Sequence, residues 1–235
     1  MDCQSLTSVE IPNSVETIGE YAFADCSALT SIAIPGSLHY IENDVFSGCT
    51  GLTSVEFHNA VYSIEERAFW GCTGLTGIEL PNSLRSIYEL AFSGCTGLTS
   101  VTVPSLVSWI GDGAFNGCSG LTQLLVQAVN PPRATRVFSA GSNLYNSVTL
   151  FVPNESLEDY QAHAEWGKFS HIVPFVGAGP GDVDGDGNIG INDVTTLIDQ
   201  LLSDGEQPAW MDVNGDGTVG IADVTLVIDM LLSGN

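Results

Sequence analysis

A constant interval between cysteines constrains this chain more than any other feature of its sequence. The chain has 235 residues, and its six cysteines recur every 23 residues, at Cys3, Cys26, Cys49, Cys72, Cys95 and Cys118. A fixed period of this length is typical of repeat proteins, in which one unit cannot bury its own apolar face and must stack on its neighbours. The sequence therefore predicts a solenoid.

Other residues recur in register with the cysteines. Each copy reads Phe-x-x-Cys-x-x-Leu-Thr, then an alternating segment such as Ser54-Val55-Glu56-Phe57, and later Ile-x-x-x-Ala/Val-Phe. The alternation predicts one short strand in each copy, followed by a turn, a second extended or helical-turn segment and a phenylalanine wedge. Stacked copies would then form short parallel strands.

The cysteines themselves are predicted to be free and buried. Equivalent positions on stacked parallel coils lie about 4.8 Å apart, so the six thiols should form one internal column. Side chains in such a column face the same way, which is poor geometry for a disulfide. The CxxC spacing of zinc clusters, with histidine nearby, is also absent.

This repeat resembles the BspA-like leucine-rich repeats of surface and secreted proteins of anaerobic bacteria. The pattern runs from Cys3 to about residue 126, so we assign residues 1–126 to the solenoid. Residues 127–176 depart from it and are similar to the C-terminal cap common on such arrays, and residues 177–180 form a linker. Because the pattern is already running at Cys3, we expect either a trimmed chain or an exposed first coil.

A duplicated acidic loop characterises residues 181–235. The twelve residues from Asp182 to Asp193 return thirty residues later, from Asp212 to Asp223, and an apolar helical stretch follows each copy. Calcium takes six to eight oxygen ligands, and such a loop presents them from positions 1, 3, 5, 7 and 12, with glycine at position 6. Two calcium ions are therefore predicted, bound by Asp182, Asp184, Asp186, the Asn188 carbonyl and Asp193, and by Asp212, Asn214, Asp216, the Thr218 carbonyl and Asp223.

The loop-then-helix unit, present twice, resembles a type I dockerin, the module with which secreted enzymes plug into cohesin domains of scaffold proteins. Position 12 is Asp where the standard motif has Glu, and position 9 is Gly. The resemblance implies a cohesin-like partner, contacted mainly through loop positions 10 and 11 and the helix that follows. Those residues are Ile191, Asn192, Ile198, Asp199, Ile221, Ala222, Ile228 and Asp229, and the hydroxyl pair typical of well-known members is absent from them.

Charge excludes several partner classes. The chain holds 28 acidic and 5 basic residues, whereas binding to nucleic acid or an anionic membrane needs clustered Lys and Arg. No apolar run is long enough to span a membrane, and no signal peptide begins at Met1, so membrane insertion is not expected. The last 55 residues hold 11 acids and no base, which supports a separate module.

The sequence offers little catalytic chemistry. Its four histidines show no spacing suited to a metal or a triad. Glu56 and Glu79 should lie on neighbouring coils about 5 Å apart, the separation that a retaining glycosidase uses. A flat sheet face supplies no pocket that excludes water, so we expect no enzyme.

Three aromatic residues are candidates for ligand contact. Trp70, Trp109 and Tyr40 stand where other copies carry mainly small residues, so we expect them to be exposed. Exposed aromatic residues contact ligands or partners, or simply pack on their neighbours at the surface.

The sequence thus predicts a mixed fold: a leucine-rich repeat solenoid with a cap, and a small all-α calcium-binding module. We interpret the chain as a secreted or cell-surface, non-catalytic binding or adhesion protein. Its solenoid would recognise a protein or glycan, including one from a host, and its module would bind a cohesin-like domain or another protein. Two alternatives stay open: an accessory component of a polysaccharide-degrading complex, and a purely structural module docked on its own solenoid.

Overall fold

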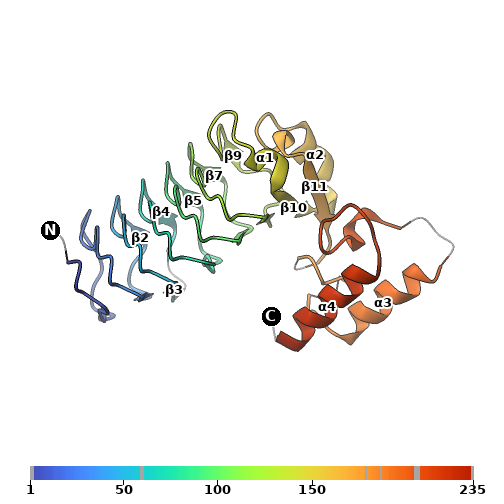
Figure 1. The fold of residues 1–235 in the computed structure, drawn as a ribbon, viewed down its shortest axis with the longest axis horizontal. Coiled ribbons are helices and arrows are strands. Elements are labelled where there is room, and N and C mark those ends of the chain that lie inside the picture. The colour runs from blue at the N-terminus through green and yellow to red at the C-terminus, as the bar shows by residue number, and fades with distance from the viewer. Residues whose placement is uncertain (1–2, 59–60, 178, 186, 204–206, 234–235) are drawn as a thin grey trace.

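The computed structural model describes residues 3–58, 61–177, 179–185, 187–203 and 207–233. It shows a row of stacked coils that leads into a capping region and then into a helical module (Figure 1). Short parallel strands line two sides of the coils. The predicted mixed fold, a repeat solenoid followed by a small helical module, is confirmed.

Two sets of strands build the solenoid, and the 23-residue period sets their register. Ser31 pairs with Ser54 and Ser63 pairs with Ser86, each one period apart. One set contains β1 (Ser31–Ile34), β3 (Ser54–Phe57), β6 (Ser100–Val103) and β8 (Gln123–Val126). The other set is the sheet of β2 (Tyr40–Ile41), β4 (Ser63–Ile64), β5 (Ser86–Ile87), β7 (Trp109–Ile110) and β9 (Arg133–Ala134), in that order.

The prediction of one strand in every copy is wrong for two copies. Residues 8–11 form no regular strand, and in residues 77–80 only an isolated bridge from Glu79 to Thr102 remains. Gly77 begins the second segment, where a glycine weakens a strand because it has no side chain to pack. The first segment belongs to the first coil, which has only one neighbouring coil to pair with.

Columns of identical side chains fill the core. Successive phenylalanine rings stack with centroids 5.3–5.6 Å apart and planes within 15° of parallel. This column consists of Phe23, Phe46, Phe69, Phe92 and Phe115. Beside it, each buried thiol from Cys49 to Cys118 donates a hydrogen bond of 3.1–3.2 Å to a phenylalanine carbonyl of the preceding coil.

All six cysteines are free, as predicted, but one of them is not buried. Cys3 is exposed because only the second coil packs against the first. The other five are buried, and burial raises the pKa of the Cys49 thiol to about 12. A raised pKa keeps a thiol protonated and unreactive at neutral pH.

A thiol reagent should therefore distinguish Cys3 from the other cysteines. We expect one reactive thiol in the native protein at pH 7 and six after denaturation without reductant, read by absorbance of the released chromophore. Two or more disulfides in the mass spectrum would contradict the register of the coils.

Truncating a phenylalanine side chain in the ring column should lower the stability of the solenoid. Replacing the fully buried ring in Phe69→Ala removes a stacking partner from both neighbouring coils, and we expect the free energy of unfolding to fall by about 3–5 kcal/mol. Urea denaturation followed by circular dichroism measures the change. The adjacent, exposed Trp70 supplies the control, since Trp70→Ala should change stability by about 0.5 kcal/mol or less.

The capping region extends the sheet and then closes it. Its elements are α1 (Leu144–Ser147), β10 (Thr149–Pro153), η1 (Asn154–Ser156), α2 (Leu157–Ala162), η2 (Trp166–Lys168) and β11 (His171–Phe175), and the sheet order is β11-β10-β8-β6. Trp166 and Tyr160 are fully buried. The Trp166 Nε1 donates to the Pro132 carbonyl at 2.8 Å, and the Tyr160 hydroxyl donates to the Ala128 carbonyl at 2.7 Å, so both polar groups of this aromatic plug are satisfied.

The helical module has a core of its own. It contains α3 (Ile191–Leu201), the short 3-10 helix η3 (Ala209–Met211) and α4 (Ile221–Ser233). Valine and leucine side chains from the two long helices meet Met211 and Val213 between them. The described residues before the first loop form no helix of the module, in agreement with the predicted loop-then-helix units.

The module packs on the solenoid sheet at its C-terminal end. Phe151 is only 2% exposed although it occupies the outward column that holds the exposed Thr102 two strands away. Phe175 is buried beside it, and η3 lies against β11. The second acidic loop approaches so closely that a Cβ atom on Gly215 would lie 2.7 Å from the Thr149 Cγ2. We call this contact the interdomain seam.

Candidate calcium-binding and docking site

The two acidic loops have matching backbones. Position 6 is Gly187 in the first loop and Gly217 in the second, and both have φ of +90°. This left-handed region is costly for residues with a Cβ, so the turn that folds the acidic side chains inward requires glycine there. The sequence duplication is thus a structural duplication.

Carboxylates gather in the first loop. One ligand atom from each of Asp182, Asp184 and Asp193 lies within 4.8 Å of the others, and Asp182 and Asp193 are almost fully buried. Asp193 reaches back from the first turn of α3, where its Oδ1 accepts hydrogen bonds from the Val183 N–H at 2.6 Å and the Asp184 N–H at 3.0 Å. The helix therefore holds the position 12 carboxylate against the start of the loop.

The second loop repeats this arrangement in part. Asp223 is fully buried, and its carboxylate accepts from the Asn214 N–H at 3.1 Å and the Gly220 N–H at 2.7 Å. Asp216 is instead exposed and accepts from the Thr218 hydroxyl at 2.7 Å, and hydrogen bonds from Thr218 lower its pKa. Among the residues described for this loop, no three carboxylates come as close together as in the first loop, since position 3 is an asparagine.

This donor set fits a hard cation. Buried carboxylates that lie side by side repel one another, and burial also raises the pKa of Asp212. A bound calcium ion would supply the missing positive charge, and all-oxygen ligands are the ones it prefers. Asp186 lies outside the described residues, and the carbonyl contributions of Asn188 and Thr218 stay predictions.

Calcium stoichiometry tests the two loops separately. We expect chelator-treated protein to bind two calcium ions by isothermal titration calorimetry, with helix content rising on binding. Asp193→Asn and Asp223→Asn should each abolish one of the two binding events, because each removes a buried position 12 carboxylate. Asp199→Asn, on the exposed side of α3, is the control and should retain both, whereas no binding at millimolar calcium would refute both sites.

The predicted partner residues are all exposed, on the two long helices of the module. Ile191 is 64% exposed and Ile221 is 76% exposed, and the side chains of Ile198 and Ile228 are also exposed. Leu202 and Leu232 follow Ile198 and Ile228 by four residues, about one helical turn, and are 80% and 79% exposed. These six apolar residues, which we call the docking face, are flanked by the exposed Asn192, Asp199, Ala222 and Asp229.

The two leucines of the docking face are partner candidates that the sequence prediction did not include among the partner-binding residues. Their signal was present in the sequence. Leu202 follows Ile198 by four residues and Leu232 follows Ile228 by four, and the buried stripe is already supplied by Val194, Leu197 and their counterparts thirty residues later.

The three aromatic candidates of the solenoid do not form one site. Tyr40 and Trp109 lie in the same outward column of the β2-β4-β5-β7-β9 sheet, separated by Ser63 and Ser86. Tyr40 is exposed, and Trp109 is half-buried because Arg133 lies over its ring. Trp70 is exposed but belongs to a turn at another corner of its coil.

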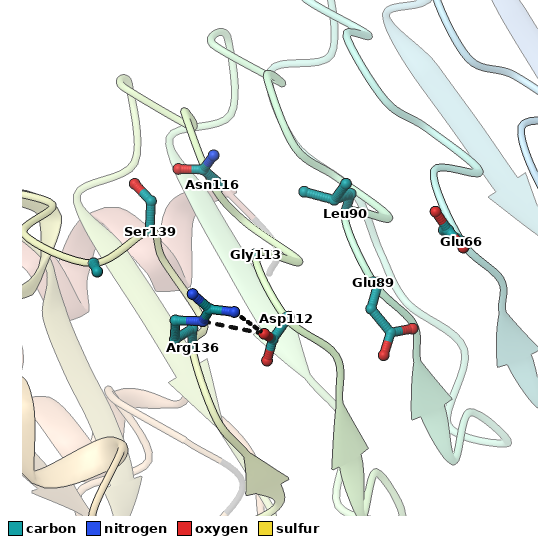
Figure 2. A pocket seen from close by; sticks show the side chains of 9 residues that line it. Glu66, Glu89, Leu90, Asp112, Gly113, Asn116, Arg136 and Ser139 are labelled. Carbon is teal, nitrogen blue, oxygen red and sulfur yellow. Dashed lines mark hydrogen bonds and ion pairs between the residues drawn. The ribbon is translucent and has the colours of Figure 1, made fainter.

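An open hollow of about 380 Å³ lies along the turns of the later coils (Figure 2). It forms over Gly113, whose φ of +65° matches the left-handed residues Arg67 and Leu90 in the preceding coils. Arg136 binds Asp112 at one end, with Nη2 and Oδ2 2.5 Å apart, while Glu66 and Glu89 line the other end. The polar side chains of its lining are three carboxylates, one arginine, one amide and the Ser139 hydroxyl, and among the described residues no hydrogen bond joins this hydroxyl to a base.

The carboxylate pair that prompted the comparison with glycosidases lies elsewhere, on the open sheet face. Glu56 is 75% exposed and lies 3.4 Å from the ring of His58, and Glu79 borders the same open surface. Solvent screens the interaction between such exposed charges. No helix in the described part of the chain is both long enough and apolar enough to cross a membrane.

Comparison with protein families identifies both parts of the chain. The model described as BspA type Leucine rich repeat region matches residues 1–129 in six copies. The Dockerin type I domain model matches residues 180–232. No curated protein matches the chain.

Solved structures of repeat proteins resemble the solenoid. A leucine-rich repeat protein of T. pallidum is 23% identical, with a TM-score of 0.47, over 63% of this chain and 77% of that one. A leucine-rich repeat protein of Bacteroides ovatus is 29% identical, with a TM-score of 0.47, over 65% of this chain and 44% of that one. The pneumococcal vaccine antigen PcpA is 23% identical, with a TM-score of 0.47, over 57% and 39%. The chain thus spans less than half the length of the latter two.

Proposed function

This chain belongs to the BspA-type leucine-rich repeat family and carries a type I dockerin domain, and from that premise we propose a two-part binding function. It is a secreted or cell-surface, non-catalytic protein whose dockerin domain attaches it to a cohesin-like partner. Its solenoid recognises a protein or glycan ligand. The observation that carries the attachment role is the docking face, an apolar surface displayed twice with the same geometry.

Exposed apolar area of this kind favours a protein partner. Six large aliphatic side chains are exposed on or beside the two long helices of this module, and concentrations of exposed apolar residues mark interaction sites. The patch follows directly from the calcium loops, because Ile191 and Ile221 begin the helices that the position 12 aspartates tie to the loops. Calcium should therefore order the surface that binds the partner.

The interdomain seam does not compete with this role. The seam uses the second loop around Gly215 and the 3-10 helix η3, whereas the docking face lies on the exposed side of α3 and α4. The module can thus contact its own solenoid and a partner at the same time. This arrangement favours attachment over a purely structural role for the module.

The alternative function is an accessory role in a polysaccharide-degrading complex. The dockerin domain supports it, since modules of this family carry their proteins into assemblies. The open carboxylate surfaces of the solenoid favour binding over hydrolysis. Release of reducing sugars from a panel of plant and host glycans is the measurement that would show a hydrolase instead.

Paired substitutions in the docking face test the attachment role. Because the thirty-residue offset makes the two halves equivalent, Ile191→Asp should weaken binding to a panel of immobilised cohesin domains by only about twofold, as one of two orientations is lost. Ile191→Asp combined with Ile221→Asp should abolish binding while both calcium ions are retained.

Surface plasmon resonance measures the binding, and calorimetry checks the calcium. Leu106→Asp is the matched control, because Leu106 is a 52% exposed aliphatic residue on the solenoid. Full cohesin affinity in the calcium-loaded double variant would refute the docking face.

A further inference from the structure

Two of the five basic residues of this acidic chain differ from the others in their partners. Arg67, Arg136 and Lys168 each form an ion pair, with Glu66, Asp112 and Glu165 respectively. Arg85 and Arg133 lie over aromatic rings instead, 5.9 Å from the centroids of Tyr62 and Trp109. In the part of the chain that the structure describes, neither of these two guanidinium groups forms an ion pair or donates a side-chain hydrogen bond to a protein acceptor.

Both arginines lie on the same side of the solenoid. Ser86, which follows Arg85, pairs with Trp109, and Trp109 pairs in turn with Arg133. The His39 ring stacks on the Tyr62 ring with centroids 5.1 Å apart. Tyr40, the next residue after His39 in the sequence, pairs with Ser63 and belongs to the same column as Trp109. We define the aromatic–arginine face as His39, Tyr40, Tyr62, Arg85, Trp109 and Arg133.

The fold does not require these side chains. In the two coils between Tyr40 and Trp109, the equivalent position holds Ser63 and Ser86. Tyr62 and Arg85 are equivalent to each other, and the same position in the coil after Arg85 holds Ser108. Tyr40 and Tyr62 remain 53% and 39% exposed. Large exposed rings and unpaired cations at positions where serine suffices indicate a binding role.

The chemistry of the face favours a ligand that carries both carboxylate groups and sugar rings. A guanidinium group presents a planar fork of donors that matches a carboxylate, and stacking on a ring leaves that fork available. Flat exposed rings offer a platform for the C–H face of a sugar. The coils repeat about every 4.8 Å, close to the length of one sugar unit, so a polymer running along the solenoid axis meets either an aromatic ring or an arginine in each coil from Tyr40 to Arg133.

Acidic residues beside the aromatic–arginine face also bear on the class of ligand. Glu42 and Glu65 extend from β2 and β4 beside the face, and the Ser63 hydroxyl already donates to Glu65. These carboxylates accept hydrogen bonds from sugar hydroxyls. Because the chain has a formal net charge of −23, the local attraction that holds an anionic sugar polymer must come from Arg85 and Arg133.

We propose that the aromatic–arginine face binds a polysaccharide that bears carboxylate groups, a polyuronate. The proposal rests on the ligand-recognition role of the solenoid and names the surface and the ligand class. Arg85 and Arg133 hold carboxylates, while Tyr40, Tyr62 and Trp109 hold sugar rings.

Affinity electrophoresis of the full calcium-loaded chain in gels containing polygalacturonate tests the proposal. We expect retardation that disappears when the polymer is fully methyl-esterified, since esterification removes the charge but keeps the sugar. Arg85→Gln with Arg133→Gln should weaken binding by about tenfold or more, the factor expected for losing hydrogen bonds to a charged group. Trp109→Ala should also weaken it.

Arg67→Gln is the matched control, because Arg67 is an exposed arginine already paired with Glu66, and this variant should bind as the native chain does. Native thiol accessibility verifies that each variant is folded. Equal binding of the esterified polymer, unchanged binding by the double arginine variant, or stronger binding to poly-glutamate would overturn the proposal.

Cohesin capture by the same samples separates the two functions. A chain that captures cohesin but ignores polygalacturonate overturns this inference and leaves the attachment role standing. A chain that binds polygalacturonate but no cohesin supports this inference and overturns the attachment role.

Discussion

Inter-coil stacking is the interaction on which the rest of this structure depends. No single 23-residue copy has a closed core, so each phenylalanine ring, thiol and strand gains its partner only from the next copy. The same contacts repeat without interruption because the period is constant. The ends of the array must then be treated differently, which the plug of Trp166 and Tyr160 does at the C-terminal end. Inward positions are consequently fixed, and outward positions are free to vary.

Functional surfaces arise where outward positions use that freedom. Tyr40, Trp109 and Arg85 replace serines of neighbouring coils on one side. Where the dockerin domain packs, Phe151 takes the place that the exposed Thr102 has in the same column, and it packs with Phe175. In the dockerin domain the duplication plays the same part, since it sets two acidic loops and two helices with exposed isoleucines in equivalent positions. Repetition thus supplies the scaffold in both domains, and departures from it supply the specificity.

Much of this organisation could be predicted from sequence because it is periodic. The cysteine interval indicated the register, and the glycines of the acidic loops indicated where the chain turns. Departures from the period were missed in this way: Cys3 is exposed because only one coil packs against the first, and the strand near Gly77 is lost because glycine has no side chain to pack. Docking of the module on its own solenoid was an open alternative, but its location could not be predicted, because nothing in the local pattern around Phe151 distinguishes an outward residue covered by another domain from one facing solvent. The unpaired state of Arg85 and Arg133 likewise required three-dimensional placement.

The interdomain seam has a mechanical consequence. Under the proposed function, the protein is held by a scaffold through one domain and by its ligand through the other, and a load between the two would cross the packed junction between Phe151 and Gly215 in addition to the short connecting segment. The solenoid therefore acts as a stiff lever arm. A ligand bound on its side is held at a set distance and angle from the anchor, whereas a flexible tether would let it swing.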